Sequence, residues 1–361
     1  MSAIYNFYAG PAVLYREVLE QAKEELLDFA GTGMSVLEIS HRAKAYDAVI
    51  EEAEANLKSL MGLNDDYRVV FLQGGASLQF SMVPMNFLPP GRTADYILTG
   101  TWSQKALQEA KKIGDTHVVF DGSDTKFNRI PNDTELRFSD DPVYVHMTTN
   151  NTIYGTEFSA LPEVKTAPLI ADMSSDILSK PLPFDKFSLI YAGAQKNLGP
   201  AGVTVVVLKK DFLARAQEVN ATMLKYSTHV EANSLYNTPP AFSVYLVNLV
   251  LRHLKKLGGL TVVAANNEKK AALIYDIIDG SDGFYKGHAE KGSRSLMNIT
   301  FTMGSADLEK QFVAESEAAG LMGLKGHRSV GGLRASVYNA MPLAGAKALA
   351  DFMVEFQRKN G

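Results

Sequence analysis

The chain has 361 residues, of which 46% are hydrophobic and 21% are charged, a profile typical of a globular protein. This length exceeds what one hydrophobic core usually serves, so we expect two domains. A formal net charge of −4 without any Lys/Arg run excludes the basic footprint of a nucleic-acid-binding protein and favours a small substrate.

Cysteine is absent from the sequence. Disulfides, thiolate metal sites and cysteine nucleophiles are therefore excluded together. A reducing cytoplasm fits this composition, and residues 1–14 lack the basic start and long apolar segment of a secretory signal. Apolar runs such as 203–208 are too short to span a membrane. We expect a cytoplasmic protein that binds no metal, membrane or nucleic acid.

Two helices are expected near the start of the chain, at 16–30 and 44–62, each closed by glycine. Short apolar runs then alternate with helical patterns such as 101–114. Seven of these runs are typical of strands: 67–72, 94–99, 116–120, 142–147, 167–172, 187–192 and 203–208. Strands buried on both faces and separated by helices predict an α/β domain with a mostly parallel seven-stranded sheet flanked by helices. Ligands of such sheets bind beyond the carboxyl ends of the strands.

The last third of the chain has a more mixed pattern. A long helix is expected at 242–259, ending in a glycine pair, and strand-like segments follow at 295–303 and 333–339. This mixture predicts a smaller α+β domain. We place the large domain at 16–257 and the small domain at 1–15 and 258–361.

Glycines and a serine follow the first strand of the expected sheet, in the string GGAS at 74–77. Glycines let the backbone approach a ligand, and a helix that begins here would offer unpaired N–H groups to an anion, with the Ser77 hydroxyl beside them. The alternative is a plain glycine turn capped by serine. The string is neither GxGxxG nor a Walker loop, so it does not support a dinucleotide or nucleoside triphosphate.

Three further residues stand near strand ends. Trp102, the only tryptophan, opens a helical pattern after the strand at 94–99, and its alternative role is that of a core aromatic. Asp172 closes an apolar strand, where a buried carboxylate needs a partner; the alternative is a helix cap. Lys196 lies between two buried strands among small residues, and desolvation there would supply the neutral amine that a Schiff base needs. Most lysines are simply solvated.

The four features fall at consecutive strand ends of one sheet, so they meet at one edge. A phosphate cradle, a stacking aromatic, an aspartate and a recessed lysine are the parts that pyridoxal phosphate requires. The sequence therefore predicts a pyridoxal-phosphate site.

At this point the sequence resembles the phosphoserine aminotransferase family, a branch of the class V aminotransferases among the fold-type I pyridoxal-phosphate enzymes. The resemblance covers essentially the whole chain. Its strings lie at 6–14, 34–42, 71–80, 100–106, 150–158, 171–179, 192–202, 235–240 and 326–340. QKNLGPAG and HRSVGGLRASVYN are the most specific of them. The resemblance implies the aspartate-aminotransferase-like fold, with a small C-terminal domain beside the large one.

The resemblance also implies roles for matched residues around pyridoxal 5′-phosphate. Lys196 would carry the cofactor and act as the catalytic base, Asp172 would hold the ring nitrogen protonated, and Trp102 would stack on the ring. The other implied cofactor contacts are Ala76, Ser77, Thr152 and Gln195, with Asn237 and Thr238 reaching the phosphate from a neighbouring subunit. The implied assembly is a homodimer with shared active sites.

The implied reaction transfers an amino group between O-phospho-L-serine or 3-phosphohydroxypyruvate and glutamate or 2-oxoglutarate, in serine biosynthesis. A second use, on 4-phosphohydroxy-L-threonine in pyridoxine biosynthesis, is left open by the sequence. The implied substrate contacts are Arg334 for the α-carboxylate, with His41, Arg42, His327 and Arg328 for the phosphate. An arginine fork fits a planar carboxylate better than lysine does.

One departure concerns the glycine-rich loop, where some family members carry arginine and this chain has Ser77. The phosphate pocket would then depend more on Arg42, His327 and Arg328. Among rivals on the same fold, a cysteine desulfurase is excluded by the lack of cysteine. An alanine–glyoxylate or serine–pyruvate aminotransferase would have no use for two His-Arg pairs. A non-catalytic binding protein of this fold could lack Lys196, and a nicotinamide dehydrogenase would need a dinucleotide fingerprint.

Overall fold

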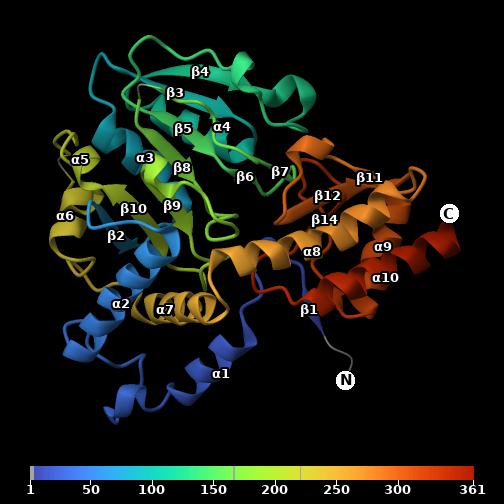
Figure 1. Cartoon of the computed structure of the whole chain (residues 1–361), viewed down its shortest axis with the longest axis horizontal. Helices are drawn as coiled ribbons and strands as arrows, with labels where there is room; N and C mark the ends of the chain where they lie inside the picture. The colour runs from blue at the N-terminus through green and yellow to red at the C-terminus, as the bar shows by residue number, and fades with distance from the viewer. Residues whose placement is uncertain (1–3, 166, 220) are drawn as a thin grey trace.

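The computed structural model describes residues 4–165, 167–219 and 221–361. A seven-stranded sheet lies at its centre, in the order β2, β10, β9, β8, β5, β3, β4 (Figure 1). The strands are β2 (Tyr67–Leu72), β3 (Thr93–Leu98), β4 (Asp115–Asp121), β5 (Val145–Thr148), β8 (Leu169–Asp172), β9 (Phe187–Gly193) and β10 (Thr204–Lys209). Of these seven, β10 alone runs in the direction opposite to the other six, so the predicted mostly parallel sheet is confirmed.

Both faces of this sheet are covered by helices, which explains the continuous apolar runs of the sequence. On β2, Val69 and Phe71 belong to a core shared with α2 (Lys44–Met61) and α7 (Ala241–Lys256). Their neighbours Val70 and Leu72 point the other way, into a core shared with α3 (Gly75–Phe87) and α4 (Thr101–Ala110). Because successive side chains alternate between the faces, each strand needs apolar residues at nearly every position.

A third core lies beside the first two, in the C-terminal part of the chain (orange and red in Figure 1). It is built on a three-stranded sheet, β11 (Lys286–Gly287), β12 (Asn298–Thr302) and β14 (Leu333–Ser336), with α8 (Leu260–Asp279), α9 (Ala306–Ala318) and α10 (Leu343–Asn360). The N-terminal segment joins this part, since β1 (Tyr5–Asn6) pairs with β13 (Leu321–Met322) and Phe7 belongs to the third core. The remaining elements are α1 (Arg16–Glu24), α5 (Lys210–Leu213), α6 (Tyr226–Glu231), β6 (Asn150–Asn151) and β7 (Thr156–Glu157).

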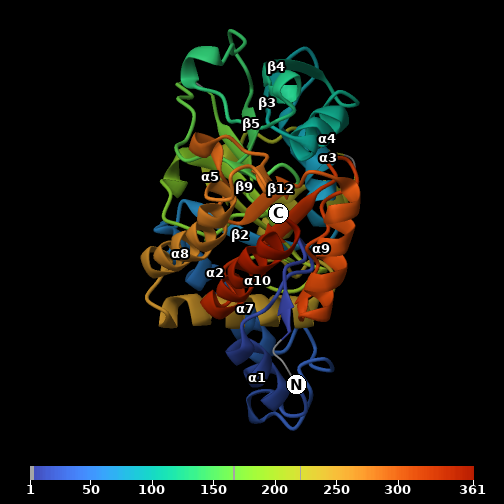
Figure 2. The same ribbon diagram turned by 90° about the vertical axis from the view of Figure 1, so that its right-hand side faces the viewer.

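The first helix is shorter than the sequence predicts. α1 ends at Glu24, whereas the apolar pattern predicted helix as far as residue 30. Beyond it the chain closes a local loop, in which Phe29 N donates to Met34 O at 2.8 Å and Asp28 Oδ1 accepts from Gly33 N at 2.7 Å. These bonds compete with continued helix, and Leu27, an apolar residue within the predicted helix, is 82% exposed. Figure 2 shows α1 beyond α7, at the end of the molecule opposite β4.

The topology brings the C-terminal part against one edge of the central sheet. The parallel strands β3, β5, β8 and β9 all end at that edge. Just past β5, Asn150 Nδ2 donates to Asn298 Oδ1 of β12 at 2.8 Å, and both residues are buried. Arg334 of β14 reaches the same region, where its Nη1 donates to Thr152 O at 3.3 Å.

Candidate active site

A cavity of about 320 Å³ lies at this edge of the sheet. It is lined by Ala9, Gly10, Gly75, Ala76, Ser77, Phe80, Trp102, Thr148, Asn150, Thr152, Ile153, Asp172, Ser174, Ser175, Gln195, Lys196, His327 and Arg334. The lining combines residues that follow several strands with residues of the N-terminal and C-terminal segments. Nine of the residues singled out from the sequence are among them: Ala76, Ser77, Trp102, Thr152, Asp172, Gln195, Lys196, His327 and Arg334.

The glycine-rich loop presents the start of α3 to the cavity. Gly74 and Gly75 both have positive φ angles, 88° and 66°, which let the chain turn from β2 into the helix. A Cβ on Gly74 would lie 2.5 Å from Leu78 Cδ2, so the turn has no room for a side chain there. The first backbone hydrogen bond of this turn runs from Leu78 N to Gly74 O. The amides of residues 75–77 have no acceptor in the described parts of the chain, so they are free to donate to an anion in the cavity.

Asp172 ends β8 and is buried, with 5% of its surface exposed. Its Oδ1 accepts two hydrogen bonds from Ser174, from the backbone N at 2.9 Å and from Oγ at 2.6 Å. Burial raises the pKa of Asp172, while the bonds from Ser174 and the charge of Lys196 oppose that rise. No described residue donates to Oδ2. A protonated ring nitrogen would supply the positive donor that this oxygen lacks.

Lys196 lies three residues beyond β9, in a turn where its N donates to Ala194 O at 2.7 Å. Its Nζ donates to Thr152 Oγ1 at 2.9 Å, which directs the amine into the cavity. Burial lowers the pKa of Lys196 to about 8, and the nearby Asp172 carboxylate limits that fall. A lysine with such a pKa is partly a neutral amine near neutral pH, which is the form that attacks a carbonyl carbon.

Trp102 is the second residue of α4, so the start of this helix places the indole beside the cavity. Its Nε1 is buried and has no hydrogen-bond partner among the described residues. Lys105, one turn further along α4, holds its Nζ 4.7 Å from the indole centroid.

Positive charge gathers on the side of the cavity formed by the C-terminal segment. Burial lowers the pKa of Arg334, which is partly buried. Burial also lowers the pKa of His327, and the charges of Arg334, Arg328 and Lys105 lower it further. No carboxylate contributes to either shift, so this side of the cavity is suited to an anionic substrate.

Five of the residues expected at the site are absent from the lining of this cavity: His41, Arg42, Asn237, Thr238 and Arg328. Arg328 directly follows His327 and acts on it through charge. His41 and Arg42 lie in the segment before α2, where His41 Nε2 is buried without a partner among the described residues. Asn237 and Thr238 lie between α6 and α7, and Gln73 Nε2 donates to Thr238 O at 3.1 Å.

The cavity also contains residues that the sequence reasoning did not single out. Ala9 and Gly10 come from the N-terminal segment, which no local pattern links to the sheet. Ser174 could have been found, because a serine two residues after a strand-end aspartate can donate both its amide and its hydroxyl to that carboxylate. Thr148 and Asn150 each have a buried side-chain oxygen without a partner in the described structure.

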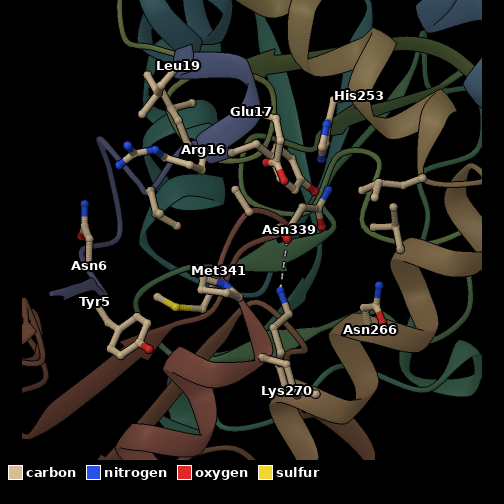
Figure 3. A pocket seen from close by; sticks show the side chains of 18 of the residues that line it. Tyr5, Asn6, Arg16, Glu17, Leu19, His253, Asn266, Lys270, Asn339 and Met341 are labelled. Carbon is tan, nitrogen blue, oxygen red and sulfur yellow. Dashed lines mark hydrogen bonds between the residues drawn. The ribbon is translucent and has the colours of Figure 1, made fainter. Parts of the chain in front are cut away.

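A second cavity, of about 650 Å³, lies between α1, α7, α8 and the segment after β14 (Figure 3). Its buried cation is Lys270, whose Nζ donates to the carbonyls of Val337, Tyr338 and Asn339 at 2.9, 2.6 and 3.3 Å. Through these bonds the Lys270 amine holds the segment that follows β14. Glu17 and His253 also line this cavity, but its buried amine is held by backbone carbonyls, so we place the reactive site at the cavity that contains Asp172 and Lys196.

Among the described residues, no group of three or more His, Cys, Asp or Glu side chains could hold a metal ion. None of the described helices is long and apolar enough to cross a membrane.

Comparisons with known proteins agree with this geometry. Residues 4–349 match the family Aminotransferase class-V. The chain is 57% identical to the phosphoserine aminotransferase of Herpetosiphon aurantiacus over 358 residues, which is 99% of each protein. The structure of phosphoserine aminotransferase from Bacillus circulans subsp. alkalophilus is 53% identical, with a TM-score of 0.98 and 99% coverage of both chains.

A third similar protein is the phosphoserine aminotransferase of Trichomonas vaginalis with PLP bound. It is 37% identical, has a TM-score of 0.92, and the match covers 98% of this chain and 100% of that one. The predicted fold-type I architecture is confirmed by these similarities. The chain belongs to the class V aminotransferases and, within them, to the phosphoserine aminotransferase family.

Proposed function

We propose that this protein is a pyridoxal-phosphate-dependent phosphoserine aminotransferase. It exchanges an amino group between O-phospho-L-serine and its keto acid, 3-phosphohydroxypyruvate, on one side and glutamate and 2-oxoglutarate on the other, in serine biosynthesis. One observation carries the proposal: a buried lysine, a buried aspartate, the open start of a helix and Arg334 line one cavity.

The cavity residues fit pyridoxal phosphate. The free amides of residues 75–77 and the Ser77 hydroxyl would hold its phosphate, together with Gln195. Asp172 would hold the ring nitrogen through the oxygen that has no donor, and Trp102 would stack on the ring. Lys196 would bind the aldehyde carbon, with Thr152 beside it at 2.9 Å.

Bound pyridoxal phosphate supplies an electron-withdrawing ring that makes the substrate Cα–H acidic. The substrate amine would replace Lys196 on the aldehyde carbon, which frees the lysine. Lys196 Nζ would then take the proton from the substrate Cα and return it to the carbon on the other side of the substrate nitrogen. The lowered pKa of Lys196 suits both steps, because the amine can be neutral before the transfer and protonated after it. Asp172 keeps a proton on the ring nitrogen, and its burial strengthens this pairing.

Substrate choice depends on the cations around the cavity. Arg334 would bind the α-carboxylate, which the substrate and glutamate share. His327, Arg328, His41 and Arg42 would bind the side-chain phosphate. A pocket that binds a phosphate through positive charge also accommodates the side-chain carboxylate of glutamate. 4-Phosphohydroxy-L-threonine stays a second candidate substrate.

A homodimer would complete this site. His41, Arg42, Asn237 and Thr238 do not line the cavity within one chain, which supports their supply by a second copy. Exposed apolar side chains near these segments also support an interface: Leu27, Met34, Leu37 and Tyr236 are 82%, 45%, 62% and 49% exposed.

Shared sites are testable with hybrid dimers. Lys196→Ala and Arg42→Ala, co-expressed with different tags and purified as the hybrid, should be more active toward O-phosphoserine than either variant alone. One site of the hybrid would then hold both intact residues. A hybrid as inactive as both parents would show that Lys196 and Arg42 serve the same site from the same chain.

The domain division is also a proposal: a large domain at 16–257 and a small domain at 1–15 and 258–361. The third core supports it, since this core joins Phe7 to residues between 271 and 356. A cytoplasmic location, proposed on the absence of cysteine, is checked by cell fractionation.

The substrate is tested by steady-state kinetics with 2-oxoglutarate as amino acceptor. We expect kcat/KM for O-phosphoserine to exceed that for serine by at least about tenfold, since one charge-assisted phosphate contact contributes roughly 1.5–3 kcal/mol. A preference for serine or alanine would keep the fold and the cofactor but overturn the substrate.

A further inference from the structure

Thr148 is the last residue of β5 and lines the cavity. It is the Cα partner of Asp172 on the neighbouring parallel strand, so the two side chains leave the same face of the sheet side by side. Only 2% of Thr148 is exposed, and its Oγ1 has no hydrogen-bond partner in the described structure.

A buried hydroxyl without a partner destabilises a fold, because the group has lost water and gained nothing in exchange. The next residue, just past β5, is a threonine whose hydroxyl does have a partner within the chain: Thr149 Oγ1 donates to Asp176 Oδ1 at 2.5 Å. A valine at position 148 would have the same shape and no polar atom. Because this unpaired hydroxyl also lines the cavity, a molecule bound there can supply the partner that the chain does not.

We propose that Thr148 is a positioning residue of the cofactor site, whose hydroxyl becomes hydrogen-bonded when the polar edge of the pyridoxal-phosphate ring binds beside Asp172. The inference rests on the proposed function. Ser174 already occupies Asp172 Oδ1 from one side, and Thr148 lies next to the same aspartate on the adjacent strand. Together they would fix the ring edge from two directions.

The test compares Thr148→Val with a matched control, Thr204→Val. Thr204 lies in the same sheet, is fully buried, and also has an Oγ1 without a partner among the described residues, but it does not line the cavity. Each apoprotein is titrated with pyridoxal phosphate to obtain the Kd, and its thermal midpoint is measured without cofactor.

We expect Thr148→Val to weaken cofactor binding about tenfold, the loss of roughly one neutral hydrogen bond, without lowering the apoprotein Tm. Thr148→Ser, which keeps the hydroxyl, should restore binding. Thr204→Val should leave the Kd unchanged. If Thr148→Val misfolds, Thr148→Ala removes the same hydroxyl and is read in the same way.

Two results would overturn the inference. A Thr148→Val or Thr148→Ala protein with the wild-type Kd would show that the hydroxyl does not serve the cofactor. A lowered apoprotein Tm that Thr148→Ser does not restore would show a packing role alone. If the wild-type chain bound no pyridoxal phosphate at all, the proposed function itself would fail, and that outcome is distinguishable from the other two.

Discussion

Replacing Ser174 by alanine removes one of the two hydrogen bonds that hold the Asp172 carboxylate. The bond from Ser174 Oγ is 2.6 Å long, both residues are buried, and its acceptor carries the charge. A charge-assisted bond of this kind contributes about 1.5–3 kcal/mol, whereas the backbone bond at 2.9 Å would survive the change. If ionised Asp172 holds the cofactor, affinity for pyridoxal phosphate should fall about ten- to hundredfold.

The pH dependence sharpens this prediction. Burial already raises the pKa of Asp172, and the loss of a donor to its charged form should raise it further. At low pH more of the variant than of the wild type is protonated at Asp172, and a neutral acid cannot pair with a cationic ring nitrogen. At high pH the carboxylate is ionised in both proteins. The affinity deficit should therefore be larger at about pH 6 than at about pH 9.

The assay is a titration of apoprotein with pyridoxal phosphate across that pH range. Ser175→Ala is the control, because the Ser175 hydroxyl contacts the Asn150 backbone and not Asp172. It should show no deficit that depends on pH. An unchanged Kd in Ser174→Ala, or a loss that is the same at every pH, would refute the view that Ser174 stabilises the charged form of Asp172.

Three further predictions follow from particular residues. Lys196→Ala should abolish turnover and prevent borohydride from fixing the cofactor to the chain; mass spectrometry that finds the label on another lysine would refute the assignment. Arg328→Ala should lower kcat/KM for phosphorylated substrates about ten- to hundredfold more than for unphosphorylated ones, and an equal loss for both would mean that Arg328 is not a phosphate ligand. Burial lowers the pKa of Lys270 from 10.5 to about 7 in the folded chain. Between these two pH values the unfolded chain therefore binds more protons than the folded chain, so the contribution of Lys270 to the free energy of unfolding rises with pH. The free energy of unfolding of Lys270→Met, measured with denaturant, should lack that rise. An increase with pH as steep as that of the wild type would refute the prediction.

The central sheet was predictable because its strands are buried on both faces. Each strand must then be apolar at successive positions, as 69–72 are, and such runs stand out in the sequence. The end of α1 was not predictable from periodicity, because Leu27 fits the apolar pattern and yet lies exposed. What ends the helix there is the hydrogen bonding of the 28–34 loop, which a search for apolar repeats does not detect.

The candidate site was predictable where its residues follow strands. Four of its residues lie at the end of a strand of one sheet or shortly after it, so the topology alone brings them together: Ala76, Trp102, Asp172 and Lys196. Gly10 could not be found in this way, because it reaches the cavity through contacts with residues nearly two hundred positions away, such as Gln195. Thr148 was missed for a different reason. The sequence places it directly after an expected strand, and only the packed structure shows that its hydroxyl has no partner.

The central claim is that this chain transfers amino groups to and from phosphorylated substrates through Lys196-bound cofactor. The most direct measurement is the visible absorbance of the holoenzyme during a half-reaction, with O-phosphoserine, glutamate, serine and alanine added separately and no keto acid present. We predict that O-phosphoserine and glutamate remove the yellow band of the bound cofactor and that serine and alanine leave it. A band that responds best to serine or alanine would contradict the substrate, and a colourless protein that cannot be reconstituted with pyridoxal phosphate would contradict the account as a whole.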